Sequence, residues 1–255
     1  TKSLTSLTAG KTYYVAVSTY DTDGNESWYS NEVLFITNTN LKVPSQYSSI
    51  QAAIDATIAG DTVSVAAGTY KENIDFEDKN IVVQSSVGFE NTIIDGQESG
   101  PTVKMKEGVI SGFTIMNGLG GGVNGNNNSS INNCLLKKNS SSSTVIMGGK
   151  IENVVIVNNT GNNILEVFRN GLINHVTMTN NHSTDSHLIT MVSTGGVIKN
   201  SIIWGNTRDG LTGTIFTETR DAYKKISHSI IQGPTEYNDM GTGVKDVNPL
   251  FCDYV

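Results

Sequence analysis

The chain has 255 residues, of which 16% are charged and 26 are glycine, and its formal net charge at pH 7 is −7. This charge disfavours nucleic acid as a partner, because phosphates need a basic face, and no apolar run approaches the ~20 residues of a membrane span. Abundant glycine, asparagine, serine and threonine are typical of a turn-rich all-β protein. We therefore expect neither nucleic acid nor a membrane span.

The first segment, residues 1–38, is predicted to form two strands and a turn. Its characteristic positions are Leu7, Gly10, Tyr13, Val15 and Val17, followed by the strand "SNEVLFIT". This spacing resembles the tyrosine-corner strand and the final strand of a fibronectin type III domain. Such a sandwich needs about 100 residues, so we expect the chain to be a piece of a longer, secreted or cell-surface protein.

Residues 39–46 are predicted to be a linker, and residues 48–58 an amphipathic helix. Ser48 with Gln51 three residues later has the spacing of a capping box. The isoleucines on one face of this helix are Ile50, Ile54 and Ile58. We expect the helix to cover the open apolar end of the coils that follow.

Residues 47–255 repeat one phrase, in which β-branched residues run into asparagine. The first isoleucines of the phrase are Ile110, Ile131, Ile151, Ile173, Ile198 and Ile226, at intervals of 20 to 28 residues. A period in the twenties indicates a solenoid, and Val/Ile segments bounded by Asn and Gly indicate strands. We predict an all-β, right-handed parallel β-helix of about eight coils, with these isoleucines stacked ~4.8 Å apart.

Polar residues recur at fixed distances from each isoleucine. Two positions on are Gly112, Asn133, Asn153, His175, Asn200 and His228, and eight positions on are Asn139, Asn159, Asn181 and Asn206. We expect the residues two positions on to form a structural ladder, in which stacked side-chain amides bond one another and cap the turns. The two histidines are expected to occupy the same ladder.

The two cysteines are expected in different coils. Cys134 takes an inward strand position, whereas Cys252 lies near the end of the chain. Several coils separate them, beyond the ~7 Å between Cα atoms that a disulfide tolerates. Cys134 is therefore predicted to be a core residue, and a partner for Cys252 would lie outside this chain.

Four stretches resemble right-handed parallel β-helix proteins of the pectin-lyase-like superfamily. They are "IQAAIDATIAGDTVSVAAGTYKENI", "KNIVVQS", "TIIDG" and, near the end, "DVNPLFCD". The resemblance spans about residues 42–255 and implies the fold, an extracellular location and a polysaccharide or cell-surface glycan as partner. It implies no single activity, because this superfamily includes lyases, hydrolases, epimerases and non-enzymatic surface proteins.

Proteins of this superfamily bind ligands along the face built from the first of three strands in each coil. The first strands of this chain are predicted to be 143–147, 163–169 and 187–193, stacked on one another. Outward candidates on them are Glu166, Phe168, Met191 and Ser193, provided that Val167 and Val192 point inward.

Two enzymatic alternatives use this face. A lyase needs a cation or a basic side chain to neutralise a uronate, and a base to remove the proton; calcium would be required only in this case, and no other cofactor or metal is expected. A hydrolase needs two carboxyl groups ~5–9.5 Å apart. Candidate residues for either activity are Glu166, Arg169, Asp185, His187, Arg208 and Asp209. Because no dense set of acids, bases or calcium ligands accompanies them, we favour a non-catalytic module that contacts glycans or spaces other domains.

Overall fold

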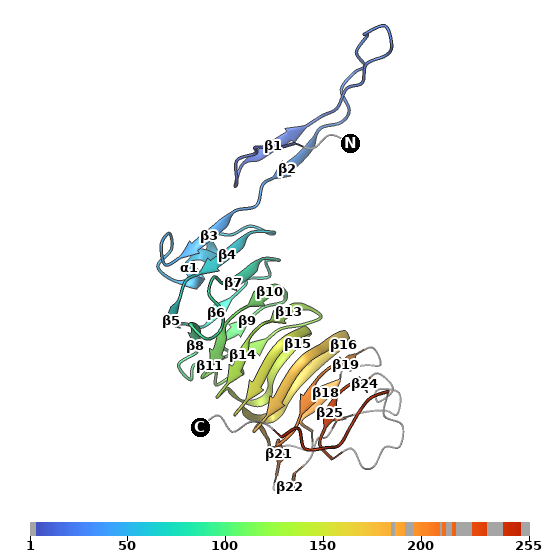
Figure 1. Cartoon of the computed structure of the whole chain (residues 1–255). Coiled ribbons are helices and arrows are strands. Elements are labelled where there is room, and N and C mark those ends of the chain that lie inside the picture. Colours follow the sequence, from blue (N-terminus) through green and yellow to red (C-terminus); the bar gives the residue numbers. More distant parts are fainter. Residues whose placement is uncertain are drawn as a thin grey trace.

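The structure is a computed structural model that describes residues 4–184, 187–191, 196–209, 211–212, 216–217, 226–233 and 242–250. These residues form an antiparallel hairpin followed by a parallel β-solenoid, and one short helix lies at their junction (Figure 1). The solenoid has about seven turns, one fewer than the sequence predicts. Its right-handed winding stays a prediction, in line with the strong preference of parallel crossovers for that hand.

The hairpin consists of β1 (Thr12–Val15) and β2 (Val33–Ile36), paired antiparallel. The Tyr13 hydroxyl accepts a hydrogen bond from the backbone N–H of Thr8 at 2.8 Å, which ties the segment before β1 to the hairpin. Every residue of β2 is exposed. The two predicted strands are confirmed, and their membership of a fibronectin type III domain stays a prediction.

The solenoid strands stack in three rows, which we call rows A, B and C in the order of the chain. Row A contains β3 (Asn40–Val43), β4 (Thr62–Val65), β7 (Val82–Ser85), β10 (Glu107–Ser111), β13 (Asn128–Asn132), β19 (Val197–Lys199) and β24 (Ile226–Ser227). Row B contains β5 (Gly68–Lys71), β8 (Thr92–Asp95), β11 (Thr114–Met116), β14 (Leu135–Lys137), β20 (Ile202–Ile203) and β25 (Ile230–Ile231). Row C contains β6 (Ile74–Asp75), β9 (Val103–Lys104), β12 (Val123–Asn124), β18 (Ile189–Met191) and β23 (Phe216–Thr217).

Two long strands pass through all three rows. They are β15 (Ser140–Val157) and β16 (Thr160–Thr179), which pair in parallel around the whole coil. At the corner between rows B and C, the short strands β17 (His182–Ser183) and β21 (Thr207–Arg208) continue their stack, and β22 (Leu211–Thr212) folds back on β21. The corner is therefore built from consecutive coils in register.

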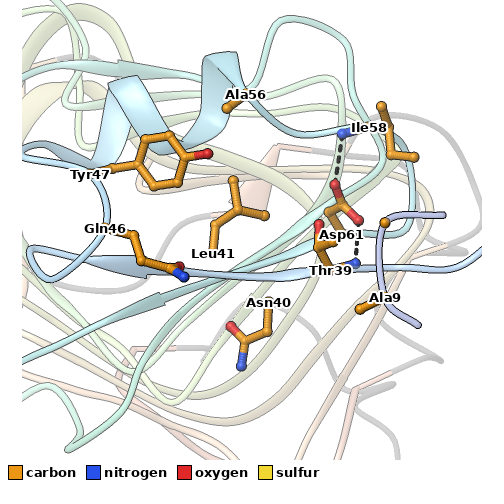
Figure 2. A pocket seen from close by; sticks show the side chains of 10 residues that line it. Ala9, Thr39, Asn40, Leu41, Gln46, Tyr47, Ala56, Ile58 and Asp61 are labelled. Carbon is orange, nitrogen blue, oxygen red and sulfur yellow. Dashed lines mark hydrogen bonds between the residues drawn. The ribbon is translucent and has the colours of Figure 1, made fainter. Parts of the chain in front are cut away.

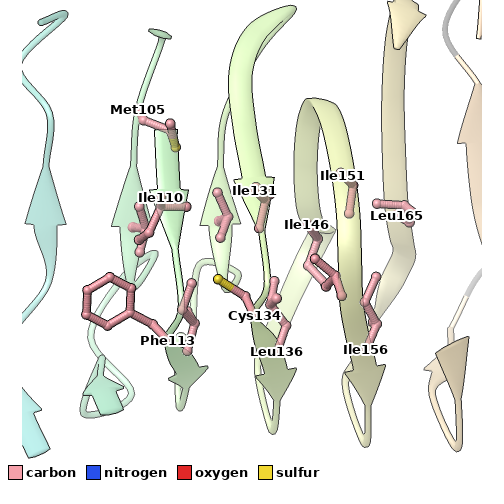
Figure 3. Packing of buried hydrophobic residues seen from close by; sticks show 14 of the residues in the cluster. Met105, Ile110, Phe113, Ile131, Cys134, Leu136, Ile146, Ile151, Ile156 and Leu165 are labelled. Carbon is pink, nitrogen blue, oxygen red and sulfur yellow. The ribbon is translucent and has the colours of Figure 1, made fainter. Parts of the chain in front are cut away.

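The predicted isoleucine register is confirmed in row A. Consecutive Cα partners are Ile110, Ile131, Ile151, Ile173, Ile198 and Ile226. All six side chains are buried, and Figure 3 shows three of them pointing into one continuous core. Full burial of such a side chain stabilises the fold by roughly 1.5–3 kcal/mol, so the repeat specifies the stack through its aliphatic interior.

The predicted ladder of residues two positions after each isoleucine is wrong except for one bond, from Asn153 to Asn133. Asn133, Asn153, His175, Asn200 and His228 are exposed, with backbone φ between 49° and 53°. They lie at the corner between rows A and B. Their backbone is in the left-handed conformation, which asparagine tolerates better than most residues. Their recurrence reflects backbone geometry at this corner, and the one amide bond between Asn153 and Asn133, at 3.3 Å, lies on the surface.

A buried ladder is formed instead by the asparagines eight positions after each isoleucine. Its members are Asn139, Asn159, Asn181 and Asn206, at most 2% exposed. Each of the first three donates its backbone N–H and its Nδ2 to the side-chain oxygen of the next, at 2.9–3.1 Å. Nδ2 also donates to a carbonyl of the preceding coil, such as Leu136 O for Asn159 at 3.0 Å. This ladder satisfies the buried backbone at the corner between rows B and C.

The helix α1 (Ile50–Asp55) is shorter than the predicted 48–58, and its N-cap is Ser49, not Ser48. The side chain of Gln51 bonds Asp55 and the backbone of Asp75, so the predicted capping box does not form. The α1 residues buried against the core are Ile50, Ala53 and Ile54. The helix contacts β3, β4 and β6, which are the first strands of rows A and C and the second strand of row A.

Side chains from the second coil supply the remaining caps of α1. Glu72 accepts hydrogen bonds from the N–H groups of Ile50 and Gln51 at 2.9 and 3.0 Å. Lys79 Nζ donates to the carbonyl oxygens of Ile54 and Asp55 at 2.9 and 3.1 Å. Both ends of this six-residue helix are therefore satisfied by tertiary contacts.

Cys134 is a core residue, as predicted, and its thiol donates to the Asn132 carbonyl oxygen at 3.1 Å. Burial raises the pKa of this thiol to about 11. Cys252 lies outside the described residues.

Candidate functional site

The three segments predicted to be stacked first strands do stack, in row C. Their outward positions continue one line along the solenoid, formed by Asp75, Lys104, Asn124, Met147, Glu166 and Thr190. Val167 is buried and Glu166 and Phe168 are partly exposed, as predicted. Met191 is the register partner of Val167 and is buried, so its predicted outward position is wrong. Val192 and Ser193 lie outside the described residues.

Among the described residues of row C, neither Cα partner of Glu166 is a carboxylate. Its Cα partners in the adjacent coils are Met147 and Thr190, at the ~4.8 Å spacing of paired strands. A hydrolase pair needs a second carboxyl group within ~5–9.5 Å. Asp185 and Asp209 are the residues predicted to approach it. Asp185 lies outside the described residues, as does the side chain of Arg169.

The other predicted site residues lie near the corner between rows B and C. The Arg208 backbone pairs with Ser183 in the corner stack, and its side chain is half-buried. Asp209 follows at the exposed end of β21, and its N–H donates to the Ser183 carbonyl at 3.2 Å. His187 is half-buried, and its carbonyl oxygen accepts from Ser183 Oγ at 2.8 Å. The structure thus places the backbones of Arg208, Asp209 and His187 beside Ser183, at the corner and outside the outward line that contains Glu166.

In the first two strands of row C, β6 and β9, two residues of the outward line form an ion pair. Lys104 Nζ lies 2.8 Å from Asp75 Oδ2. The hydrogen bond to Asp75 raises the pKa of Lys104. Partial burial raises the pKa of Asp75, but the bond from Lys104 opposes it and the net shift is downward. Lys104 is therefore already paired with a carboxylate on this face.

The corner between rows B and C carries a stack of polar residues that the sequence prediction did not assign to a site. Its members are Ser140, Thr160, His182 and Thr207, which are consecutive Cα partners. Each directly follows a ladder asparagine, so the buried amides fix the backbone that presents them. The sequence signal for this corner is the repeated Ser, Thr or His after each of those asparagines.

A groove of about 390 Å³ runs along this corner. It is lined by Leu119, Ser140, Ser141, Ser142, Thr160, Gly161, Asn162 and Thr184. None of these residues is charged, and Leu119 adds an exposed apolar side chain. Thr184 Oγ1 donates to Asn162 Oδ1 at 2.8 Å, which fixes the orientation of that amide. The groove can thus hydrogen-bond a polar, uncharged ligand and contact its apolar surface.

Within the described part of the chain, no group of three or more His, Cys, Asp or Glu residues is placed to hold a metal ion. Among the same residues, no helix has the length and apolar character needed to cross a membrane.

The sequence matches no family model and no curated protein. Solved structures that are similar to it include pectin methylesterases. The Aspergillus niger enzyme in deglycosylated form is 15% identical with a TM-score of 0.43, covering 83% of this chain and 90% of that one. The carrot enzyme is 13% identical with a TM-score of 0.36, covering 81% and 83%. The Erwinia chrysanthemi enzyme is 11% identical with a TM-score of 0.33, covering 78% and 71%.

These similarities are too weak to carry an argument about this chain. Its architecture follows from its own strand register, in which three rows of parallel strands stack in consecutive coils. The chain is therefore a parallel β-solenoid with an uncharged groove at one corner.

Proposed function

We propose that this chain is a non-catalytic, extracellular β-helix module of a larger protein, and that it binds an uncharged polysaccharide or cell-surface glycan in the corner groove. The lining of the groove carries the proposal, because hydroxyl and amide groups beside an apolar side chain suit a sugar. A uronate polymer would instead need a cation or basic side chains to offset its carboxylates.

The repetition of the corner supports a linear ligand. Ser140, Thr160, His182 and Thr207 recur in successive coils, at the ~4.8 Å spacing of paired strands. A polymer lying along the solenoid axis would meet similar hydrogen-bonding groups in each coil. His182 Nδ1 lies 2.9 Å from Thr207 Oγ1, so neighbouring members of the stack also orient each other.

A polysaccharide lyase or glycoside hydrolase on row C is the alternative. Against it stand the pairing of Lys104 with Asp75 and the neighbours of Glu166, which are Met147 and Thr190. Calcium would belong to this alternative alone, as part of a lyase mechanism.

We further propose that residues 1–38 end a fibronectin type III-like domain, that residues 39–46 link it to the β-helix of residues 47–255, and that α1 covers the open end of that β-helix. Supporting observations are the exposure of β2 and the burial of Ile50 and Ile54 against the first strands.

A glycan array with matched groove variants tests the proposed function. Ser142 and Ser143 are adjacent and exposed, but only Ser142 lines the groove. We expect binding to neutral glycans, a loss of at least tenfold in affinity in Ser142→Trp, and wild-type affinity in Ser143→Trp. Binding confined to acidic glycans, or equal binding by both variants, would contradict the proposal.

The same glycans, incubated with the protein, test the enzymatic alternative. Unsaturated products detected by ultraviolet absorbance would establish a lyase, and new reducing ends without them would establish a hydrolase. Either result would overturn the non-catalytic assignment.

A further inference from the structure

A second cavity lies at the first coil of the solenoid, between that coil and the loop before β1 (Figure 2). It has a volume of about 710 Å³, within the ~300–1,000 Å³ of small-ligand sites. Its lining comes from the loop before β1, from β3 and the residues on either side of it, and from the segment between α1 and β4. It shares no lining residue with the corner groove.

We call this space the junction cavity. Its outer wall is the segment before β1, and hydrogen bonds fix that segment to the residue that follows β2. The N–H of Gly10 donates to the Thr37 carbonyl at 2.9 Å, and Thr37 Oγ1 donates to the Thr8 carbonyl at 2.6 Å. Gly10 has φ +69°, and a Cβ there would lie 2.8 Å from Thr39 Cγ2. The wall therefore approaches Thr39 too closely for a side chain at position 10.

The cavity presents no free charge. Asp61, the one charged residue in its lining, is 2% exposed. Its two carboxylate oxygens accept the N–H groups of Thr39 and Ile58 at 2.7 and 2.9 Å, as the dashed lines in Figure 2 show. This carboxylate organises the wall, and a ligand here would not be selected by charge.

Polar side chains of the lining remain available to a ligand. Among them are the Tyr47 hydroxyl, Gln46 Nε2 and the side-chain amide of Asn40, none of which bonds another residue in the described part of the chain. Figure 2 shows the Tyr47 ring and Leu41 facing the same space. The lining thus combines an aromatic ring and aliphatic surface with uncharged donors and acceptors.

The open edge of β3 favours a compact ligand over an added strand. Thr62 N–H bonds the Thr39 carbonyl and Ala66 N–H bonds the Val43 carbonyl, so the backbone groups of Asn40 and Lys42 point away from β4. Those of Lys42 are already taken, because its N–H donates to Gln46 Oε1 and its carbonyl accepts from the N–H of Gln46. Strand addition needs a run of unpaired backbone groups, whereas this edge leaves those of Asn40 alone.

We propose that the junction cavity binds a single neutral pyranose unit, such as the end or a branch of a glycan. One face of a pyranose ring consists of C–H groups that can pack on Tyr47 and Leu41, and its hydroxyls match the amides of Asn40 and Gln46. The site is independent of the corner groove, so this inference does not rest on the proposed function.

Saturation-transfer NMR on the full chain tests the site with methyl glycosides of glucose, galactose and mannose, with galacturonate, and with a short neutral peptide. Ala56 and Ala59 are both exposed after α1, but only Ala56 lines the cavity. We expect at least one neutral glycoside to bind, Ala56→Trp to weaken it at least tenfold, and Ala59→Trp to leave it unchanged. Asn40→Ala and Tyr47→Phe should each weaken it severalfold while keeping the wild-type melting temperature.

The outcomes separate the two sites. Ser142→Trp should not change binding in the junction cavity, and Ala56→Trp should not change binding in the corner groove. The inference is overturned if no neutral glycoside binds, if only galacturonate or the peptide binds, or if Ala56→Trp and Ala59→Trp bind equally well.

Discussion

Asn159 donates two hydrogen bonds to the single side-chain oxygen of Asn181, one from its backbone N–H at 3.0 Å and one from its Nδ2 at 2.9 Å. The same two-donor arrangement joins Asn139 to Asn159 in the preceding coil. Because both donors and the acceptor are buried, the arrangement links adjacent coils where no water can replace the bonds.

Asn159→Ala should strongly destabilise the fold. It leaves the backbone N–H of Asn139 without its partner and removes one bond each from Asn139 Nδ2, which keeps the Ile115 carbonyl, and from the Leu136 carbonyl. Each buried group left unsatisfied costs ~1–3 kcal/mol. We expect a loss of roughly 3 kcal/mol in the free energy of unfolding, measured by urea denaturation. The matched control is Asn153→Gly at the exposed corner, where glycine suits the φ of 52°; it should change stability by less than ~0.5 kcal/mol. Equal losses of unfolding free energy in both variants would show that the buried ladder at Asn159 does not stabilise the fold.

Glu72→Ala should destabilise the start of the solenoid through α1. The carboxylate accepts from the first two N–H groups of the helix, and loss of a cap costs about 1 kcal/mol. We expect a loss of this size in denaturant unfolding, with faster amide exchange at Ile50 and Gln51. Lys71→Ala, at the exposed preceding residue, is the control and should leave both measurements unchanged. Unchanged exchange in Glu72→Ala would show that the cap is not needed.

The stability of row A should depend on pH through Glu152. Hydrogen bonds from Lys150 and then from Asn174 lower the pKa of this carboxyl from its ordinary 4.5. The folded pKa is the lower one, so the stabilisation is fully present above pH 4.5 and is lost as the pH falls through the folded pKa. A side-chain NMR titration should give a midpoint below 4.5 that moves upward in Lys150→Met. An unchanged midpoint in that variant would exclude Lys150 as the main cause.

Cys134 should be unreactive in the folded protein. Burial keeps its thiol pKa near 11, and only the thiolate is nucleophilic. In a Cys252→Ser background, we expect labelling with a thiol reagent at neutral pH to be at least 100-fold slower in buffer than in guanidinium chloride. Comparable rates in both conditions would show that the coil around Cys134 opens readily.

The sequence by itself determined the solenoid, because its isoleucine period directly encodes which residues share the core. Cα partners such as Ile131 and Ile151 could be paired from spacing alone, and so could the inward position of Cys134. Alternation along a strand placed Glu166 outward only on the condition that Val167 points inward, and the structure met that condition. These features depend on local periodicity, which can be read from the sequence without knowing how the chain turns at each corner.

The tertiary structure decided which asparagines are buried. Asn153 and Asn159 both belong to repeated positions of the sequence, but only Asn159 meets an inward corner where the Leu136 carbonyl of the preceding coil can accept its amide. The caps of α1 likewise come from Glu72 and Lys79, more than twenty residues away from the groups that they bond. Spacing in the sequence does not report such partners, because a hydrogen bond between coils depends on how the chain turns at each corner.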